Sequence, residues 1–396
     1  MQIYDFDKNR RIVNIELEER LMKSFKELSN KKAYLKTKNN ISKIHGINKE
    51  IFNFDEIQYT HTYIENKTIG TKSLNSKNIY KSIYNKNIDY SKFVDCNFNN
   101  IKFENCTFKG SIFENCKFCN VYFYHCNFED EEEVIGYFDN CIFESCNLYK
   151  SNMKDVIFQF TKLIKLKISL SSLRNSIFKE CIIDEIIFSD CDLKSMKIIS
   201  TDINILSFED EFISKVDENT FIDLLEFDKK NKNSYINIFK AYKNISAIFE
   251  KNRLFSHSGE YYYLAKCAER KSLKGFEKLK SEIFYYVCGY GERPTFALIS
   301  SLEIVLIFSI IYMFSGLCVN ERIIHYNLNI ISYLPRKLIY MDFIDCFYFS
   351  LVTFTTVGYG DIFPIGYSIL FSCVEMLLGV TMVGVWTATL ARKITR

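Results

Sequence analysis

Proline is scarce in this chain and unevenly placed. The 396 residues contain three prolines, Pro294, Pro335 and Pro364, and all of them fall in the last quarter of the sequence. The long region before them therefore has no proline-rich linkers. The net charge is also small, at +3, and it gives no indication of nucleic-acid binding.

A secretion signal is missing as well. Residues Met1 to Arg10 are polar and no signal peptide is visible, so we expect the long N-terminal region to stay inside the cell. The 14 cysteines suit a reducing cytosol better than a disulfide scaffold. We also find no set of residues that predicts an enzyme.

Two long apolar segments stand out near the C-terminal end. Thr295 to Val319 carries one charge, Glu303, and Tyr367 to Ala391 carries one charge, Glu375. Each is long enough to cross a bilayer, which takes about 20 apolar residues. Phe343 to Thr355, between them, is too short to cross at about 1.5 Å per residue, so it predicts a re-entrant helix.

The string Thr356-Val-Gly-Tyr-Gly-Asp361 follows this short segment. Non-helical backbone at membrane depth survives only when it is buried in protein or lines a watery path. The string is similar to the selectivity filter of potassium channels, in which backbone carbonyls replace the hydration shell of the ion. From Gly289 to Arg396 the order of span, pore helix, filter and span resembles the two-transmembrane potassium channel family.

This resemblance implies roles for particular residues. K⁺ would be bound by five filter residues, Thr356, Val357, Gly358, Tyr359 and Gly360. Support for the filter would come from Thr355, Asp361 and Tyr348, with Tyr348 donating a hydrogen bond to Asp361. A homotetramer is implied because one chain supplies one filter strand. We expect no metal other than K⁺ and no organic cofactor.

The pore helix departs from the family pattern. Many relatives have two tryptophans there, and some have a carboxylate that pairs with the aspartate after the filter. Tyr348, Phe349 and Val352 occupy these places here. A weakly selective cation channel therefore stays open as an alternative.

The second span offers candidate gating and cavity residues. Gly379 falls where the family has its hinge glycine, although glycine also serves close packing in membrane helices. Val383 and Thr387, one helical turn apart, are the expected lining of the cavity below the filter. Both interpretations of Gly379 remain open.

Glu303 and Glu375 lie within about a turn of the same depth. Carboxylates inside a membrane are costly and usually face protein or water. We therefore expect them to meet each other or the back of the pore helix. A structural, hydrogen-bonded role and a proton-sensitive gate are the two alternatives.

Basic residues indicate the orientation of the spans. Three follow the second span and four precede the first, which agrees with the positive-inside rule: Arg392, Lys393, Arg396, Lys274, Lys278, Lys280 and Arg293. We expect an integral protein of the cell membrane with both ends in the cytoplasm.

A five-residue repeat fills the middle of the chain. Every fifth residue from Ile83 to Phe208 is apolar except Glu133, and neither a helix nor a flat strand has this period. Small residues, often cysteine, recur two positions earlier. The pattern resembles the pentapeptide-repeat family, which implies a right-handed square β-helix with four repeats per coil.

Two features inside the repeat suggest alternatives to a plain solenoid. Cys116 and Cys119 have a spacing that metal sites use, but the repeat places them on different faces, so we expect no metal there. The acidic run Glu129 to Glu133 is either a solvated loop or a site for a cation or a basic partner.

The predicted fold is a multidomain membrane protein. Residues 1–80 have no assigned role, with a helix expected near Ile15 to Leu35. The β-helix covers 81–210, and a helical connector covers 211–293, with an antiparallel pair broken around Ser256 to Gly259. The all-α pore domain covers 294–396, divided into a first span at 294–319, a pore helix at 343–355, a filter at 356–361 and a second span at 366–393.

Together these features predict a tetrameric, potassium-selective channel in a lipid bilayer. The repeats would regulate or organise it, with a cytosolic regulator as their partner. No arginine-rich voltage-sensing helix and no nucleotide-binding fold after the pore is visible in the sequence. The alternative from another class is a membrane-tethered scaffold whose pore is closed or vestigial.

Overall fold

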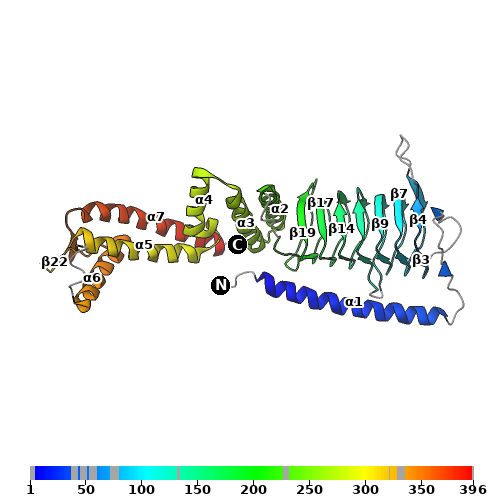
Figure 1. Ribbon diagram of the computed structural model, residues 1–396, viewed down its shortest axis with the longest axis horizontal. Coiled ribbons are helices and arrows are strands. Elements are labelled where there is room, and N and C mark those ends of the chain that lie inside the picture. The colour runs from blue at the N-terminus through cyan, green and yellow to red at the C-terminus, as the bar shows by residue number, and fades with distance from the viewer. Residues whose placement is uncertain are drawn as a thin grey trace. The chain divides into compact units, whose positions relative to one another are not determined.

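The computed structural model describes residues 5–36, 43–44, 51–52, 60–71, 80–131, 134–225, 232–320, 322–327 and 335–394. These residues form two compact units, Met1–Ser272 and Leu273–Arg396, drawn in Figure 1. The first unit contains the repeat and the second the two long apolar segments. Arg396 of the predicted basic group, and parts of residues 1–80, lie outside the described residues.

A parallel β-solenoid forms the body of the first unit. Its strands are β1 (Lys43–Ile44), β2 (Ile51–Phe52), β3 (Tyr63–Glu65), β4 (Thr68–Gly70), β5 (Lys81–Tyr84), β6 (Lys92–Val94), β7 (Asn97–Glu104), β8 (Ile112–Glu114), β9 (Lys117–Tyr124), β10 (Tyr137–Asp139), β11 (Ile142–Glu144), β12 (Asn147–Tyr149), β13 (Ile157–Gln159), β14 (Lys162–Ile164), β15 (Leu166–Ser169), β16 (Ile177–Lys179), β17 (Ile182–Ser189), β18 (Lys197–Ile199), β19 (Asp202–Phe208) and β20 (Phe221–Ile222).

The strand register confirms the predicted β-helix. Phe98 lies opposite Phe118 and Leu163 opposite Ile183, so one coil takes 20 residues, or four repeats of five. Corners fall at every fifth residue, where the backbone takes a positive φ, as at Asn105 (55°). Asparagine tolerates this left-handed conformation better than most residues do, which explains why it recurs at the corners.

Stacked phenylalanines fill the interior. Phe98 stacks on Phe118, and Phe118 on Phe143, with ring centroids 4.6 Å apart in both pairs. Burial of each such side chain contributes about 1.5–3 kcal/mol. The small inward residues hold adjacent coils together, since the Cys126 thiol donates to the Phe103 carbonyl at 3.5 Å. Burial raises the pKa of Cys126 to about 12, so this group stays a thiol.

Some coils of the solenoid take more than 20 residues. Phe118 lies opposite Phe143, a spacing of 25 residues, so this coil is one five-residue segment longer than a coil of 20. The parallel sheets also begin before residue 81, since β3 pairs with β6 and β4 with β7. Glycine, polar residues and an irregular spacing hide these early strands from a five-residue count.

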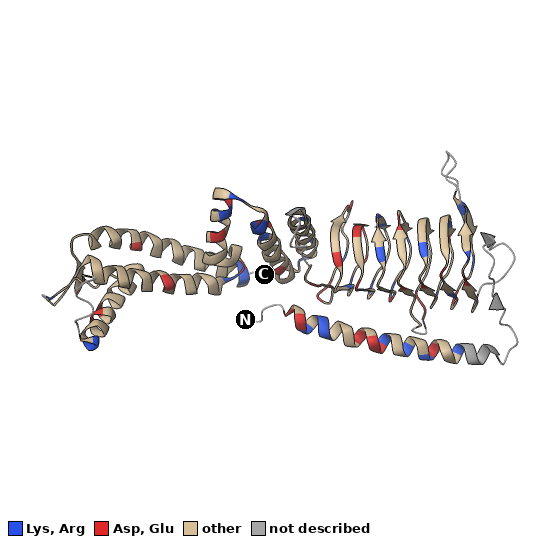
Figure 2. Cartoon of the chain, in the orientation of Figure 1, with Lys and Arg blue, Asp and Glu red and all other residues tan. Residues whose placement is uncertain are grey.

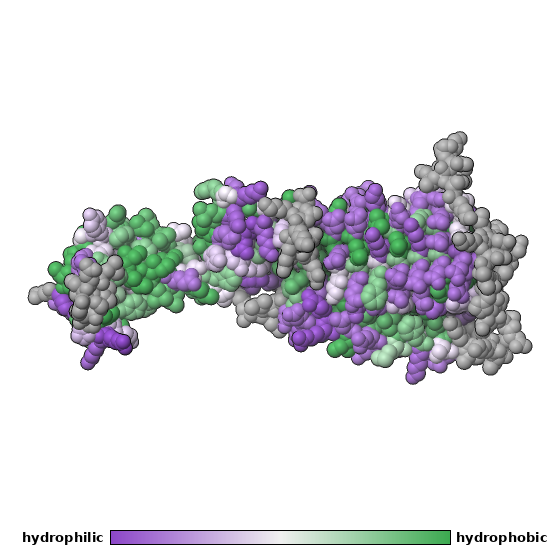
Figure 3. Space-filling model, in the orientation of Figure 1, coloured by the Kyte–Doolittle hydropathy of each residue, from purple (hydrophilic) through white to green (hydrophobic). Residues whose placement is uncertain are grey.

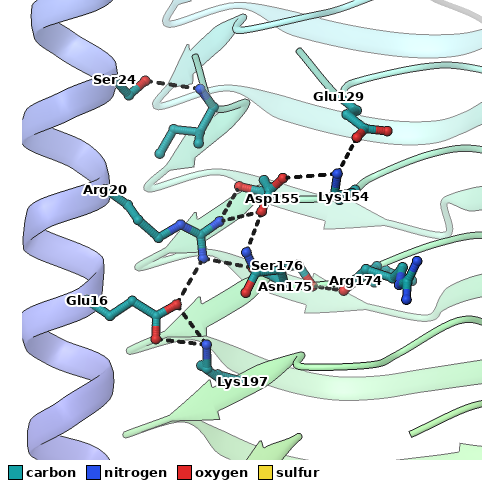
Figure 4. A network of polar contacts seen from close by, with 12 residues as sticks. Glu16, Arg20, Ser24, Glu129, Lys154, Asp155, Arg174, Asn175, Ser176 and Lys197 are labelled. Carbon is teal, nitrogen blue, oxygen red and sulfur yellow. Dashed lines mark hydrogen bonds and ion pairs between the residues drawn. The ribbon is translucent and has the colours of Figure 1, made fainter. Parts of the chain in front are cut away.

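Helix α1 (Phe6–Lys36) packs along the 9-stranded sheet of the solenoid, and it is longer than the helix expected near Ile15 to Leu35. It buries Val13, Leu17 and Leu28 against an outward apolar column that includes Ile157 and Ile177. Ion pairs flank this contact, as Figure 4 shows for Arg20 and Glu16. Arg20 contacts Asp155 at 3.3 Å and Glu16 accepts from Lys197 at 2.7 Å.

The acidic run takes part in holding α1. Asp130 is 3.3 Å from Lys31 of α1 and accepts a hydrogen bond from Tyr90 at 2.8 Å. Glu129 pairs with Lys154 on the neighbouring coil, and this contact lowers the pKa of Glu129. The basic partner weighed for this run is thus supplied by the same chain.

Helices α2 (Lys232–Lys251) and α3 (Phe255–Ser272) close the last coil of the solenoid. Ile238, Ile245 and Tyr242 are buried in the same core as the solenoid interior. The two helices part at 252–254, slightly before the predicted break at Ser256 to Gly259. This antiparallel pair therefore belongs to the repeat unit, as its cap.

The second unit contains most of the remaining elements: α4 (Gly275–Cys288), η1 (Gly289–Gly291), α5 (Pro294–Ser315), β21 (Leu317–Val319), β22 (Arg322–Ile324), α6 (Arg336–Phe354), β23 (Ile362–Pro364) and α7 (Ser368–Ile394). Strands β22, β21 and β23 form an antiparallel sheet in that order. It joins the end of α5 to the segment after the predicted filter.

Three boundaries in this unit differ from the predicted ones. The first span ends at Ser315 rather than 319, because Gly316 takes a φ of 113° and the next residues pair with β23. The pore helix begins at Arg336, not at 343, directly after Pro335. The charged residues of its first turns hid this start. The second span runs from Ser368 to Ile394, close to the predicted 366–393.

Candidate functional site

Helix α6 ends at the base of the predicted filter and is hydrogen-bonded to it. The Thr356 amide donates to the Thr353 carbonyl, and the Val357 amide donates to the Val352 carbonyl, both at 3.0 Å. The Thr355 hydroxyl donates to the Leu351 carbonyl at 2.7 Å. The first filter residues are therefore held by the last turn of the pore helix.

The backbone of the filter segment alternates in handedness. Thr356, Gly358 and Gly360 take φ values of 58°, 58° and 77°, and the residues between them have no positive φ. Alternation of this kind turns successive peptide planes the same way, with amides on one side and carbonyls on the other. A ladder of oxygens along one side is what a dehydrated cation needs.

Thr356 is the strained member of this segment. A positive φ in a β-branched residue is an outlier that costs about 1–3 kcal/mol and persists only where the surroundings enforce it. Its hydroxyl donates to the Thr355 carbonyl at 2.7 Å. The glycines at 358 and 360 take similar dihedrals at no such cost.

Asp361 closes the segment and is tied to the pore helix. The Tyr348 hydroxyl donates to the Asp361 carboxylate at 2.8 Å, the hydrogen bond expected from the sequence. This contact joins the end of the filter to the middle of α6.

Replacing Tyr348 with phenylalanine is expected to shorten the time for which the filter conducts. The change removes the hydroxyl and leaves the ring, so it breaks the link to Asp361 without removing packing. Tyr340→Phe is the matched control, because Tyr340 lies on the same helix, is 65% exposed and makes no hydrogen bond among the described residues. The length of open bursts in single-channel recordings measures the effect. Equal burst lengths in the two variants would contradict it.

Glu375 lies behind the filter in a three-helix polar contact. Its side chain is fully buried, accepts a hydrogen bond from the Tyr312 hydroxyl of α5 at 2.6 Å and accepts another from the Ser350 hydroxyl of α6. The Ser350 hydroxyl also lies 2.9 Å from the Val305 carbonyl. Of the two partners weighed for Glu375, the structure places it against the pore helix.

Gly379 lies one turn below Glu375 and touches the backbone of α6. A Cβ at this position would fall 2.8 Å from the carbonyl carbon of Phe354 and closer still to its oxygen. Phe354 is the last residue of α6, two residues before Thr356. Glu375 contacts Ser350, and Gly379 contacts Phe354 one helical turn further along both helices. Helix α7 therefore packs along α6 in a matched register.

Other predicted residues lie on open faces of the single chain. Val383 and Thr387 are exposed on α7. Glu303 is exposed on α5, while Glu375 is completely buried, so the two carboxylates have different surroundings. Val357 and Tyr359 of the filter are 52% and 71% exposed.

Two ion pairs of this unit were missed in the sequence. At the filter side, Arg322 pairs with the buried Asp342 of α6, which also accepts a hydrogen bond from Tyr326. At the other end of the spans, Arg392 of α7 lies 3.0 Å from the buried Glu292 that precedes α5. Charges flanking apolar segments were the available signal, but their partners are far away in the sequence.

The surfaces of α5 and α7 suit a lipid environment. Both helices are long and apolar enough to cross a membrane. They are the two helices among the described residues that meet this test. Figure 2 shows charged residues to be sparse along them, and Figure 3 shows a largely hydrophobic surface over this part of the unit. No group of three or more potential metal-ligating residues occurs among the described residues.

Comparisons with protein families match two separate segments of the chain. Residues 323–396 match the ion channel family, and residues 93–131 match pentapeptide repeats. Neither family is a kind of enzyme. The match at 93–131 covers only part of the solenoid seen in the structure. The comparison with curated proteins finds no match for this chain.

The solved structures named here each cover less than half of this chain. QnrB1, a plasmid-mediated fluoroquinolone resistance protein, is 13% identical, with 43% of this chain and 88% of that chain covered and a TM-score of 0.25. HetL, a pentapeptide repeat protein involved in heterocyst differentiation regulation from the cyanobacterium Nostoc sp. strain PCC 7120, is 10% identical over 44% and 86%, with a TM-score of 0.17. At these TM-scores the likeness carries no argument about this chain.

Proposed function

Because an ion-channel domain follows pentapeptide repeats in this membrane protein, we propose that four copies of the chain surround one axis and conduct K⁺ through residues 356–361. The observation that carries the proposal is the alternating backbone of Thr356, Gly358 and Gly360 at the end of a re-entrant helix. One strand supplies one side of a coordination shell. Four strands are needed to enclose an ion.

The exposed faces of the single chain support this assembly. Val357 and Tyr359 are apolar or aromatic side chains that a monomer would leave open, and Val383 and Thr387 lie on a free side of α7. In a tetramer the filter side chains pack behind the ladder, and the α7 residues line the cavity. We infer from the positive-inside rule that the repeat unit and the end of α7 lie on the cytoplasmic side of the cell membrane.

Purified protein in liposomes is expected to release K⁺ down a gradient, with block by Ba²⁺ and loss of flux in Tyr359→Ala. The variant removes a ring that holds one layer of the ladder in place. Flux of K⁺ and of Na⁺ is measured under matched gradients. A purified tetramer without flux favours the membrane-tethered scaffold. Equal Na⁺ and K⁺ flux favours a weakly selective cation channel.

We propose in addition that the repeat unit regulates or organises the pore through a cytosolic partner. Deletion tests this, and the structure sets where it should end. Asn244 of α2 donates to the Leu206 carbonyl at 2.8 Å, and α2 is buried against the last coil. Deletion of 1–208 would strip the cap of its core, so deletion of 1–272 is the cleaner variant. An unchanged open probability reduces the unit to assembly or targeting.

A further inference from the structure

Arg322 connects the strand that follows the predicted filter with the first half of the pore helix. It lies on β22, opposite Val319 of β21, and Val319 lies opposite Ile362 of β23. Ile362 comes directly after Asp361. Arg322 is thus in the same cross-strand row as the residue after the predicted filter, two strand spacings or about 10 Å away.

The guanidinium of Arg322 pairs with Asp342, the first buried residue of α6. The Asp342 side chain is 7% exposed, and it also accepts a hydrogen bond from the Tyr326 hydroxyl. The Tyr326 amide in turn donates to the Met313 carbonyl of α5 at 2.8 Å. Because a buried carboxylate has to be paired, the position of this part of α6 depends on Arg322.

The Arg322 pair and the Tyr348 hydrogen bond hold α6 at two points. Tyr348 donates to Asp361 at 2.8 Å, so this point is joined to the end of the predicted filter directly. Asp342 lies six residues before Tyr348 on the same helix, which is less than two turns. This second point is joined to Asp361 through β22, β21 and β23. The end of the predicted filter and the first half of α6 are therefore linked twice.

Asp342 is the important partner of Arg322. A second carboxylate, Asp345, is 3.7 Å from Arg322, and its side chain is 36% exposed. An exposed pair of this kind contributes little to stability. Loss of Arg322 would instead leave the buried Asp342 without its cation, and a single unpaired charge is unfavourable in a buried position. The first half of α6 would then have to move to bring Asp342 into contact with water.

Such a movement bears on ion selectivity. A ladder of carbonyls can replace the hydration shell of K⁺ only while the surrounding structure keeps the oxygens in place. We propose that Arg322 is a positioning residue of the filter, because it holds the first half of α6 in register with the strand after Asp361. This inference rests on the proposed function as a K⁺ channel. It assigns to the three-stranded sheet a part in selectivity.

Arg322→Met tests the proposal in the full-length protein. Methionine keeps much of the length of the side chain but carries no charge and donates no hydrogen bond. We expect the Na⁺ to K⁺ permeability ratio to rise about tenfold, as for the loss of one hydrogen bond between charged groups. Reversal potentials between Na⁺ and K⁺ solutions across planar bilayers measure this ratio. Arg322→Lys keeps a cation and is expected to restore most of the wild-type selectivity.

Lys337→Met is the matched control. Lys337 lies in the first turn of α6, is exposed and makes no ion pair among the described residues, so this variant loses the same charge without leaving a buried partner. Its permeability ratio is expected to stay at the wild-type value. Tyr326→Phe is a second, milder variant that removes one hydroxyl from Asp342 and keeps the ring. It is expected to raise the ratio by less than Arg322→Met does, and it tests the proposal even if Arg322→Met does not assemble.

The outcomes separate this inference from the proposed function. Wild-type protein that conducts K⁺, with an unchanged ratio in Arg322→Met and Tyr326→Phe, overturns the inference and leaves the channel standing. The same holds if these variants melt at a lower temperature but keep the ratio, since the pair is then a structural contact only. An equal rise in Lys337→Met also overturns it, because surface charge alone would account for the effect. Wild-type protein without K⁺ flux overturns the proposed function, and this inference with it.

Discussion

Gly379→Ala is expected to abolish K⁺ flux and to lower the thermal stability of the purified protein. The new methyl group would overlap the Phe354 backbone, and backbone cannot swing aside as a side chain can. Overpacking of this kind costs about 1–3 kcal/mol. Here the cost falls on the last residue of α6, two residues before Thr356, so we expect α6 and the start of the predicted filter to shift together.

Gly384→Ala is the matched control for this change. Gly384 lies on the same helix, and a Cβ there would meet nothing within 4 Å. The two interpretations of Gly379 also separate in this comparison. Close packing predicts a lower melting temperature and a weaker tetramer in the Gly379 variant. A hinge predicts an intact tetramer with altered opening, and wild-type stability together with wild-type flux would refute both.

Glu375→Leu is expected to cause a second large loss. The leucine fills the site but accepts no hydrogen bond, which leaves the buried hydroxyl of Tyr312 without its acceptor, while the Ser350 hydroxyl keeps the Val305 carbonyl. Each unsatisfied buried group costs about 1–3 kcal/mol. We expect a lower melting temperature and few conducting channels, because α7 loses its hydrogen bonds to α5 and α6.

Glu375→Gln and Glu303→Gln complete this experiment. Glutamine keeps one acceptor oxygen, so Glu375→Gln should fall between wild type and Glu375→Leu. Glu303 is exposed on α5, and its variant should keep wild-type stability. If Glu375 is instead a proton-sensitive gate, Glu375→Gln removes the pH dependence of the current while stability stays high. Equal stability of Glu375→Leu and Glu303→Gln would refute the supporting role.

The repeat could be predicted from the sequence because its period is carried by each unit of five residues. A run such as Phe93 to Phe128 needs no knowledge of distant residues, and the family matches confirm it. The early strands β3 and β4 escaped because the chain between them and β5 breaks the period. The docking of α1 escaped because its partners, such as Asp155 and Lys197, are more than 100 residues away.

The candidate site shows the same division. The filter string and the two spans are local patterns. That the carbonyls of the string bind K⁺ stays a prediction. The contacts behind the filter depend on how helices pack. Nothing near Tyr312 or Ser350 in the sequence indicates that both donate to Glu375. The start of α6 was missed because the charged Asp342 suggested a loop. Its ion pair with Arg322 shows why it can be buried in a helix.

The antiparallel sheet of β21, β22 and β23 has a consequence for how the pore can move. It ties the end of α5 to the chain beyond Asp361, and a hydrogen bond of 2.6 Å between the Ser315 and Ser368 hydroxyls reinforces the junction. Glu375 is bonded to both neighbouring helices, so α5, α6 and α7 are joined by hydrogen bonds in this region. The part of α7 beyond Gly379 lies outside these contacts. If it bent away, the Glu292–Arg392 ion pair would have to break.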